Sequence, residues 1–197
     1  MQKNISELSN EEIAKMFPVE LSAYNADWPI LFEAEKLRIA AALGTDLIRI
    51  EHFGSTSIPG ITAKDTIDIL ADINPDESKH DAIVAAMKTI GYDFMWQLDG
   101  APNYRIFPKG FNTAGKKEQT FIIHSGPADH KLWDRLYFRG YLREHPNVAA
   151  EYETLKLELA HQYKYDRVGY RIAKTDFVLA VTQRAKEYYN NKTSDAV

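Results

Sequence analysis

The sequence predicts an α+β fold, in which a mixed sheet with flanking helices is followed by a C-terminal helical bundle. Up to about residue 127, largely apolar segments of strand length alternate with segments of helical periodicity. Beyond that point, apolar and aromatic residues recur only at helical spacing. The chain has 197 residues, 45% of them hydrophobic and 26% charged, which is ordinary for one globular domain with a sizeable core.

Three parts follow from this pattern. Residues 1–18 form a polar N-terminal arm, 19–127 an α/β core, and 128–197 a helical part that packs on the core. No linker-like stretch separates the last two parts, so a single domain is expected.

A first helix is expected to begin at Asp27, whose carboxylate would cap it, with Trp28 and Pro29 at early positions. Apolar residues then recur at roughly helical spacing until Gly44 ends the segment; they are Ile30, Leu31, Ala34, Leu37, Ala41 and Leu43. A strand is predicted over 47–53 and a loop over 54–60. A second strand, over 66–73, is largely apolar and therefore central.

An amphipathic helix over 76–89 should turn Ile83, Val84 and Met87 inward. Short strands and a hairpin loop are predicted next, the strands over 92–97, 104–107 and 119–124 and the loop over 109–117. Three helices should close the chain, over 129–144, 147–164 and 167–190. Pro146 lies near the start of the second of them, and Asp166 would cap the third.

Charge and composition exclude several classes of protein. A net charge of −4 argues against a nucleic-acid partner. No run of 18 apolar residues favours a membrane span, and the polar N-terminal segment lacks the apolar core of a signal peptide. There is no cysteine, and the six histidines form no HxxxH or HExxH pair, so a zinc site is not expected. A cytoplasmic location fits these features, while the oligomeric state stays open.

The turn after the first strand carries the strongest chemical signal. Gly54 and the hydroxyl residues Ser55, Thr56 and Ser57 offer backbone N–H groups and hydroxyls to an anion. Thirteen residues after Ser55, Asp68 lies inside the next strand. A carboxylate beside a phosphate-binding turn is what a site for Mg²⁺ and a nucleotide requires. The expected partner is a nucleotide or a phosphorylated small molecule, with Mg²⁺ as the cofactor.

The segment IEHFGSTSIPGITAKDTIDI resembles the signature of the GrpB family, which belongs to the nucleotidyltransferase superfamily. The resemblance continues through YRIFPK, His124 and FRGYLREHP into the closing helices, and covers about residues 19–186. Two positions depart from the family pattern, with Asp65 in place of a proline and Gly140 in place of an aspartate. Related domains occur fused to dephospho-CoA kinase, which suggests nucleotide or coenzyme-A chemistry nearby.

The resemblance implies a nucleotidyltransferase-like core over 19–127 and Mg²⁺-dependent nucleotidyl transfer. Active members of the superfamily carry two carboxylates at positions i and i+2 of one strand. Here Leu70 occupies the i+2 position from Asp68, and Asp72 is about 13 Å from Asp68 along the strand. The alternative function is therefore a catalytically degenerate module that binds a nucleotide or phosphate without transferase activity.

The residues that we expect to serve this site have three roles. Asp68 and His124 are the catalytic candidates, and Asp68 is also the metal ligand. The phosphate-binding candidates are Gly54, Ser55, Thr56, Ser57, Lys64, Arg105 and Lys109.

Each candidate also has a purely structural interpretation. Asp68 could be a buried acid paired with Lys64 or Arg105, and His124 a core histidine. Arg105 and Lys109, which alternate on one strand face, could form a surface salt bridge.

Other conspicuous residues are predicted to be structural. His52, just before the loop, is one of them. Arg139 and Arg143, four residues apart on one helix, and Lys156 on the next could face a phosphate, but pairing with Glu144 and Glu153 is favoured. The residues Trp28, Trp96 and Trp133 are expected in the core.

Overall fold

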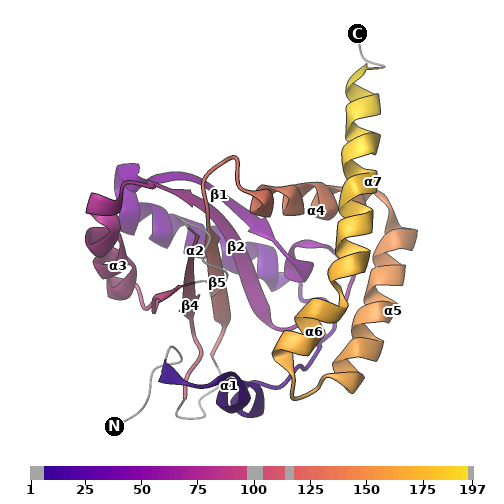
Figure 1. Cartoon of the computed structure of the whole chain (residues 1–197), viewed down its shortest axis with the longest axis horizontal. Helices are drawn as coiled ribbons and strands as arrows, with labels where there is room; N and C mark the ends of the chain where they lie inside the picture. Colours follow the sequence, from indigo (N-terminus) through magenta and orange to yellow (C-terminus); the bar gives the residue numbers. More distant parts are fainter. Residues whose placement is uncertain (1–6, 97–103, 114–117, 195–197) are drawn as a thin grey trace.

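A computed structural model describes residues 7–96, 104–113 and 118–194, and its architecture is a mixed sheet with helices on one face and at one side (Figure 1). The predicted α+β class is confirmed. The five strands lie in the order β1-β2-β5-β4-β3. Their bounds are β1 (Leu47–Phe53), β2 (Thr66–Ile73), β3 (Met95–Trp96), β4 (Arg105–Lys109) and β5 (Thr120–Ser125).

The sheet combines both kinds of pairing. Strand β2 runs antiparallel to β1 and parallel to β5, while β4 runs antiparallel to both β5 and β3. The β2 strand therefore lies inside the sheet, as its apolar sequence predicted. Its start and end, and those of β1, match the predicted ranges.

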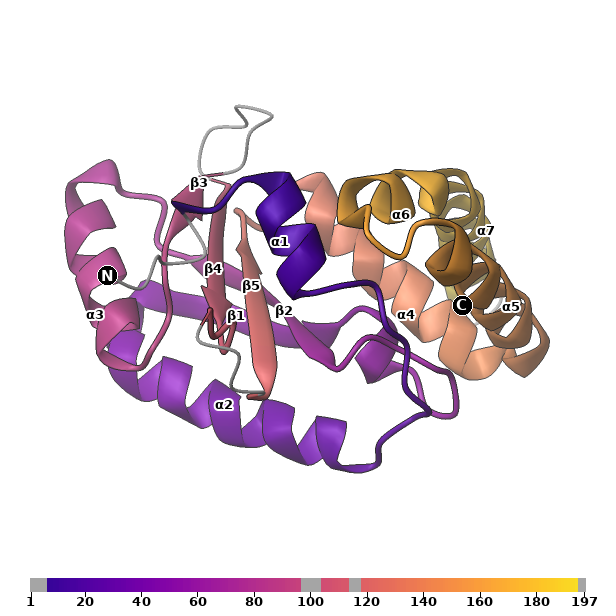
Figure 2. The same ribbon diagram turned by 90° about the horizontal axis from the view of Figure 1, so that it is seen from below.

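Seven α-helices belong to the described residues. They are α1 (Asn10–Met16), α2 (Asp27–Leu43), α3 (His80–Thr89), α4 (Arg135–Glu144), α5 (Pro146–Gln162), α6 (Arg167–Ala173) and α7 (Thr175–Ser194). Helices α2 and α3 lie along one face of the sheet, and α4 to α7 gather at one side (Figure 2). The last turns of α7 project beyond the rest of the molecule (Figure 1).

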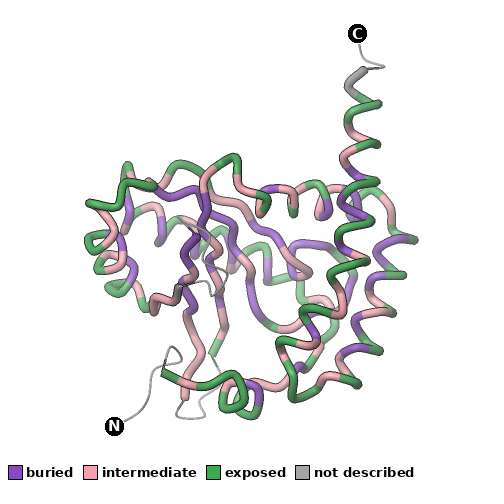
Figure 3. Tube along the Cα trace, viewed as in Figure 1, coloured by how far each residue is buried: buried purple, intermediate pink, exposed green. Residues whose placement is uncertain are grey.

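The main core lies between the sheet and helices α2 and α3. Because side chains alternate along a strand, Ile67, Ile69 and Ala71 of β2 face these helices. Figure 3 shows the resulting band of buried residues through the sheet. Asp68 and Leu70 then lie on the opposite face, which is where the candidate site forms.

Helix α2 differs from the prediction in its cap and in its buried face. Asp27 is the first helical residue and not the cap; its own backbone N–H donates to Asn25 Oδ1 at 2.9 Å. Ile30 and Leu37, part of the predicted apolar set, are 67% and 71% exposed. The buried positions are Trp28, Phe32, Glu35, Ile39 and Leu43.

The C-terminal helices and the arm also refine the prediction. The third predicted helix is interrupted near Lys174, which separates α6 from α7, although Asp166 does cap α6 by accepting from the Gly169 N–H. The arm contains α1, with a Ser9–Glu12 capping box.

Some predicted features cannot be compared with the structure. Residues 1–6 of the arm, Gln97 of a predicted strand and 114–117 of the predicted loop lie outside the described residues, as does the side chain of Trp96. Within the described ranges, every helix is too short or too polar to cross a bilayer.

Candidate functional site

The candidate site forms where the β1 strand ends beside the middle of the sheet. The antiparallel register places Phe53, the last residue of β1, opposite Asp68 of β2. The next residue, Gly54, therefore lies directly against the Asp68 side chain. A Cβ at Gly54 would lie 2.3 Å from Asp68 Oδ2, so only glycine fits here.

The loop after β1 uses most of its hydroxyls internally. A 3₁₀ turn covers Ser55–Ser57, and the Ser57 hydroxyl donates to the Gly54 carbonyl at 2.6 Å. The Thr56 hydroxyl lies 3.0 Å from His52 Nε2, and both Thr56 and Ser57 are buried. Of the predicted anion-binding loop, Gly54 and Ser55 remain partly exposed.

Helix α4 holds this loop in place through two arginines. Arg143 donates from Nε and Nη2 to the Ser57 carbonyl, at 2.9 and 2.6 Å. Arg139 donates from Nη1 to the His52 carbonyl at 2.5 Å and to Glu51 Oε2 at 3.2 Å. Charged donors of this kind fix the backbone path of the loop.

The favoured pairing of these cations with Glu144 and Glu153 is therefore wrong. Glu144 binds Lys192 at 3.0 Å, and Glu153 accepts the Thr62 backbone N–H at 2.5 Å. Lys156 is buried and donates to the Thr62 carbonyl. The two helices α4 and α5 thus hold the chain on both sides of residues 58–61.

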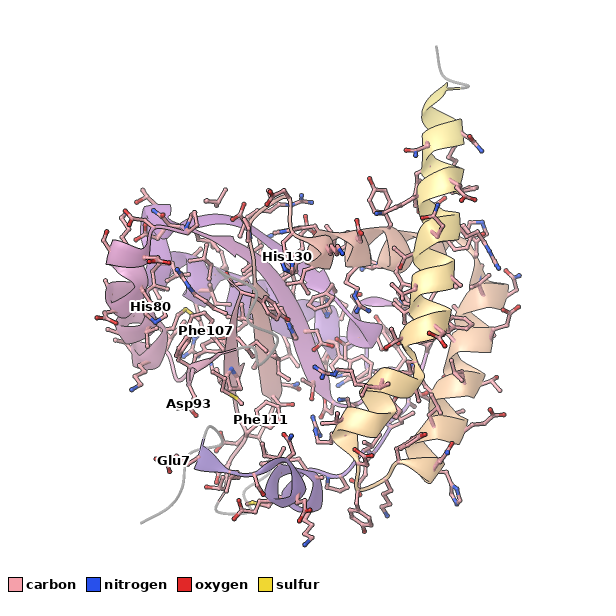
Figure 4. All side chains as sticks on the ribbon, in the orientation of Figure 1. Glu7, His80, Asp93, Phe107, Phe111 and His130 are labelled. Atoms are coloured by element: carbon pink, nitrogen blue, oxygen red, sulfur yellow. The ribbon has the colours of Figure 1, made fainter. Side chains whose placement is uncertain are left out.

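His124 of β5 faces the same side of the sheet as Asp68. Its Nε2 lies 3.9 Å from Asp68 Oδ1, and its Nδ1 lies 2.7 Å from the Tyr104 hydroxyl. Tyr104 stacks in turn on His130, which lies where the chain enters α4 (Figure 4). Burial and the positive charges of Arg135 and Arg171 lower the pKa of His124 to about 4, so the ring is neutral at pH 7.

The positive charges of five cations act on this acid or on this histidine. Burial raises the pKa of Asp68, while the positive charges of Lys64, Lys174, Arg167 and Arg135 act in the opposite direction. We call Lys64, Arg135, Arg167, Arg171 and Lys174 the basic cluster. Its members come from the approach to β2, from the start of α4 and from α6 with its C-cap.

Contacts with Tyr170 of α6 locate two members of the basic cluster. The Lys64 and Lys174 ammonium groups lie 5.8 and 4.2 Å from the centre of its ring. Burial and the charge of Arg167 lower the pKa of Lys64 to about 7. In the described part of the chain, no carboxylate forms an ion pair within 4 Å with any of the five cations.

Sequence reasoning assigned a site role to Lys64 alone of these five. The sequence did contain a signal for the basic residues of α6. Arg167, Arg171 and Lys174 are spaced four and three residues apart, so they share one helical face. Nothing in the spacing shows which part of the sheet that face meets.

Arg105 and Lys109 do not join the site, and their predicted placement is wrong. Ile106 pairs with His124 and therefore shares its face of the sheet. Arg105 and Lys109 lie an odd number of residues from Ile106 on the same strand, so their side chains point to the opposite face, away from Asp68 and His124. Arg105 is buried and donates to the Asn74 carbonyl at 3.3 Å. Lys109 Nζ lies 2.6 Å from the buried Glu35 Oε1, so the surface salt-bridge alternative is wrong as well.

Leu70, which occupies the position where active nucleotidyltransferases carry a second carboxylate, lies in the core. Leu70 has no exposed surface and packs against Phe53 and Trp133. No three His, Asp or Glu side chains of the described residues come close enough together to hold a metal ion. One carboxylate among five cations does not fit the Mg²⁺ that the resemblance implies, since a divalent cation prefers several anionic oxygens.

His52 is a structural residue, as predicted. It is buried, stacks on Phe32 with ring centroids 4.8 Å apart, and binds Thr56. Burial, then the charges of Arg143 and Arg139, lower its pKa to about 4. Its neutral form therefore stabilises the fold above the ordinary pKa of about 6.5, and this contribution is lost as the pH falls from 6.5 towards 4.

Acidification should reveal this contribution in a His52→Gln variant. The difference in unfolding free energy between parent and variant is expected to shrink by up to about 3 kcal/mol from pH 7.5 to 4. Denaturant titrations at several pH values measure it. A difference for His52→Gln that stays constant over this pH range would contradict the proposed cause.

Comparisons with known proteins agree on one family. Residues 18–184 match the family model described as "GrpB protein". The chain is 34% identical over 179 residues to the UPF0157 protein YqkA of Bacillus subtilis, covering 89% of this chain and 50% of that one. Thus the chain spans about half the length of that relative. It is 35% identical to the UPF0157 protein SCO7215 of Streptomyces coelicolor, over 85% of this chain and 84% of the relative.

A solved structure resembles most of this fold. The conserved protein GrpB from Enterococcus faecalis superimposes with a TM-score of 0.72 at 29% identity, covering 86% of this chain and 99% of the other.

Proposed function

The chain belongs to the GrpB family, and we propose that its Asp68 site binds a nucleotide or a phosphorylated small molecule. By the Asp68 site we mean Gly54, Ser55, Lys64, Asp68 and His124. One observation supports the proposal above the others. A glycine turn, a carboxylate and a neutral histidine meet on one face of the sheet, close to five cations for which the described residues provide no ion-pair partner.

The charge balance of the site favours an anionic ligand. The protein as a whole carries a net charge of −4, so a local excess of cations is not the general character of its surface. Unpaired cations that lie together repel one another, which costs stability in the absence of a ligand. A phosphate group relieves this repulsion and accepts several charged hydrogen bonds.

Binding without catalysis is the form of the function that the geometry supports best. The place of a second carboxylate is taken by Leu70, which is wholly buried. Nucleotidyl transfer is the second candidate, favoured by the 3.9 Å approach of the neutral His124 to Asp68 beside Gly54. Asp68 and His124 stay the predicted catalytic residues in that case.

A thermal-shift screen tests the binding function. Nucleoside mono-, di- and triphosphates, dephospho-CoA and sugar phosphates are each added with Mg²⁺ or with EDTA. A true ligand should stabilise the folded protein by about 2.7 kcal/mol at one hundred times its dissociation constant. If no phosphorylated compound raises the melting temperature of the parent protein, with Mg²⁺ or with EDTA, the binding function is wrong.

Transfer is tested separately, by pyrophosphate release from nucleoside triphosphates in the presence of Mg²⁺ and a panel of small hydroxyl and phosphate compounds as acceptors of the nucleotidyl group. Release that is absent in both Asp68→Asn and His124→Gln would support the second candidate. Ligand binding without any release would leave the non-catalytic module as the function.

A further inference from the structure

The basic cluster gives the ligand of the Asp68 site a definite charge. Four of the cluster's cations, Lys64, Arg135, Arg167 and Lys174, act on the Asp68 carboxylate, and the fifth, Arg171, acts on the neutral His124. A single phosphate monoester carries about two negative charges at neutral pH, and a di- or triphosphate carries about three to four. The excess of positive charge therefore matches a chain of phosphates better than one phosphate.

The cations come from parts of the chain that are far apart in sequence. Lys64 precedes β2, Arg135 opens α4, and Arg167, Arg171 and Lys174 come from α6 and its C-cap. The α6 side of the cluster is rigidly placed, because Tyr170 is buried and Arg167 donates to the Phe17 carbonyl at 2.8 Å. Gly54 completes the arrangement, because its backbone lies directly against the Asp68 side chain.

The same arrangement of charges does not favour the binding of a divalent metal ion. Asp68 is the carboxylate of the site, and its side chain is 32% exposed beside Gly54. A metal ion bound to it would lie among cations, which carry charge of the same sign as the metal. Adding a dication there would oppose the positive charges of Arg135, Arg167, Arg171 and Lys174, and that of Lys64 when it is protonated. The side chains already supply the charge that a metal ion brings to a phosphate site.

We propose that the basic cluster, and not a divalent metal ion, neutralises the ligand's phosphates, and that the ligand carries a di- or triphosphate group. This inference rests on the proposed function, since it names the ligand class and the binding chemistry of the same site. Binding should then be independent of Mg²⁺. Chelated Mg²⁺ lowers the negative charge of a polyphosphate, so free polyphosphate should bind as tightly as its Mg²⁺ complex or more tightly.

Isothermal titration with inorganic tripolyphosphate and with ATP tests this inference, in EDTA and in excess Mg²⁺. In the parent protein the dissociation constant in EDTA should equal or fall below the value in Mg²⁺. In Arg135→Gln/Arg171→Gln, binding should weaken by about tenfold for each cation removed. Both residues are exposed, so the variant should fold normally. The matched control Lys88→Gln/Arg184→Gln removes two exposed cations elsewhere and should bind like the parent.

Asp68→Asn separates the two chemistries most sharply. If cations alone hold the phosphates, removing the carboxylate removes a repulsion, and tripolyphosphate should bind about tenfold more tightly. If Asp68 holds a metal ion, the same change should weaken binding in Mg²⁺.

The outcomes distinguish this inference from the function on which it rests. Binding that requires Mg²⁺, or that is unchanged in Arg135→Gln/Arg171→Gln, would overturn the inference and leave phosphate binding intact. An absence of binding by every phosphorylated compound, with and without Mg²⁺, would overturn the proposed function itself.

Discussion

Replacing Lys109 by methionine should lower the free energy of unfolding by about 3 kcal/mol, because among the described cations it leaves the buried Glu35 carboxylate with only the exposed Arg38, whose Nε is 3.9 Å from Glu35 Oε2. Lys109 Nζ lies 2.6 Å from Glu35 Oε1, and Glu35 is 5% exposed. The same ammonium lies 5.1 and 5.5 Å from the ring centres of Tyr92 and Phe121. Methionine preserves most of the stem and its packing, so the loss reports mainly on the charge.

Two further variants isolate the cause in denaturant titrations. Lys88→Met removes an exposed lysine from α3 and should change stability by less than about 0.5 kcal/mol. Glu35→Leu combined with Lys109→Met removes both charges and should recover much of the loss, as is common for buried ion pairs. Phosphate affinity of Lys109→Met should match the parent. Unchanged stability with lost affinity would instead return Lys109 to its predicted phosphate role.

The error over Lys109 shows what strand periodicity can and cannot provide. Alternation correctly places Arg105 and Lys109 on one face of β4. Alternation does not show which face of the strand meets the core. A lysine in the sequence also does not indicate whether a buried acidic partner lies opposite it. Glu35, the residue that decides the matter, is 74 positions away in the sequence.

For helix α2, too, the sequence does not show which face meets the core. Apolar residues occur on more than one of its faces, so periodicity predicts the helix and its end at Gly44 but not the buried side. The side is set by tertiary contacts, among them the bond from Trp28 Nε1 to Asp65 Oδ1 at 2.8 Å. Asp65 is one of the two departures from the family pattern, and here it anchors a core tryptophan.

One part of the candidate site can be predicted from local sequence, and the other part depends on long-range packing. The approach of Gly54 to Asp68 follows from two adjacent antiparallel strands joined through one loop, and both strands were predicted with correct bounds. The contribution of α6 depends on how a helix some 100 residues later packs beside that loop. Its residues carry a helical pattern but no signal of their neighbours.

Replacing Gly54 by alanine is expected to disrupt both the fold and phosphate binding. Its φ of 71° and ψ of −175° lie in a region that glycine alone adopts readily, so an alanine costs about 1–3 kcal/mol in backbone strain. The new Cβ would also lie 2.3 Å from Asp68 Oδ2 and 2.9 Å from Asp68 Cβ, which adds about 1–3 kcal/mol of overpacking. The total loss of stability should be about 2–6 kcal/mol.

Gly60→Ala is the matched control for the backbone part of this loss. Gly60 also has a positive φ, of 84°, but no atom lies within 4 Å of where its Cβ would stand. Its variant should lose stability by backbone strain alone and should bind tripolyphosphate like the parent. The difference between the two glycine variants then measures the contact with Asp68.

A double-mutant cycle with Asp68→Gly tests that contact directly. Removing the Asp68 side chain frees the space that the alanine needs, so the pair Gly54→Ala/Asp68→Gly should be more stable than the sum of the single losses predicts, by about 1 kcal/mol or more. Residues in contact couple in this way, whereas distant ones add. Strictly additive losses would mean that the loop moves away from Asp68 in the variant, and the turn and the carboxylate would then not form one site.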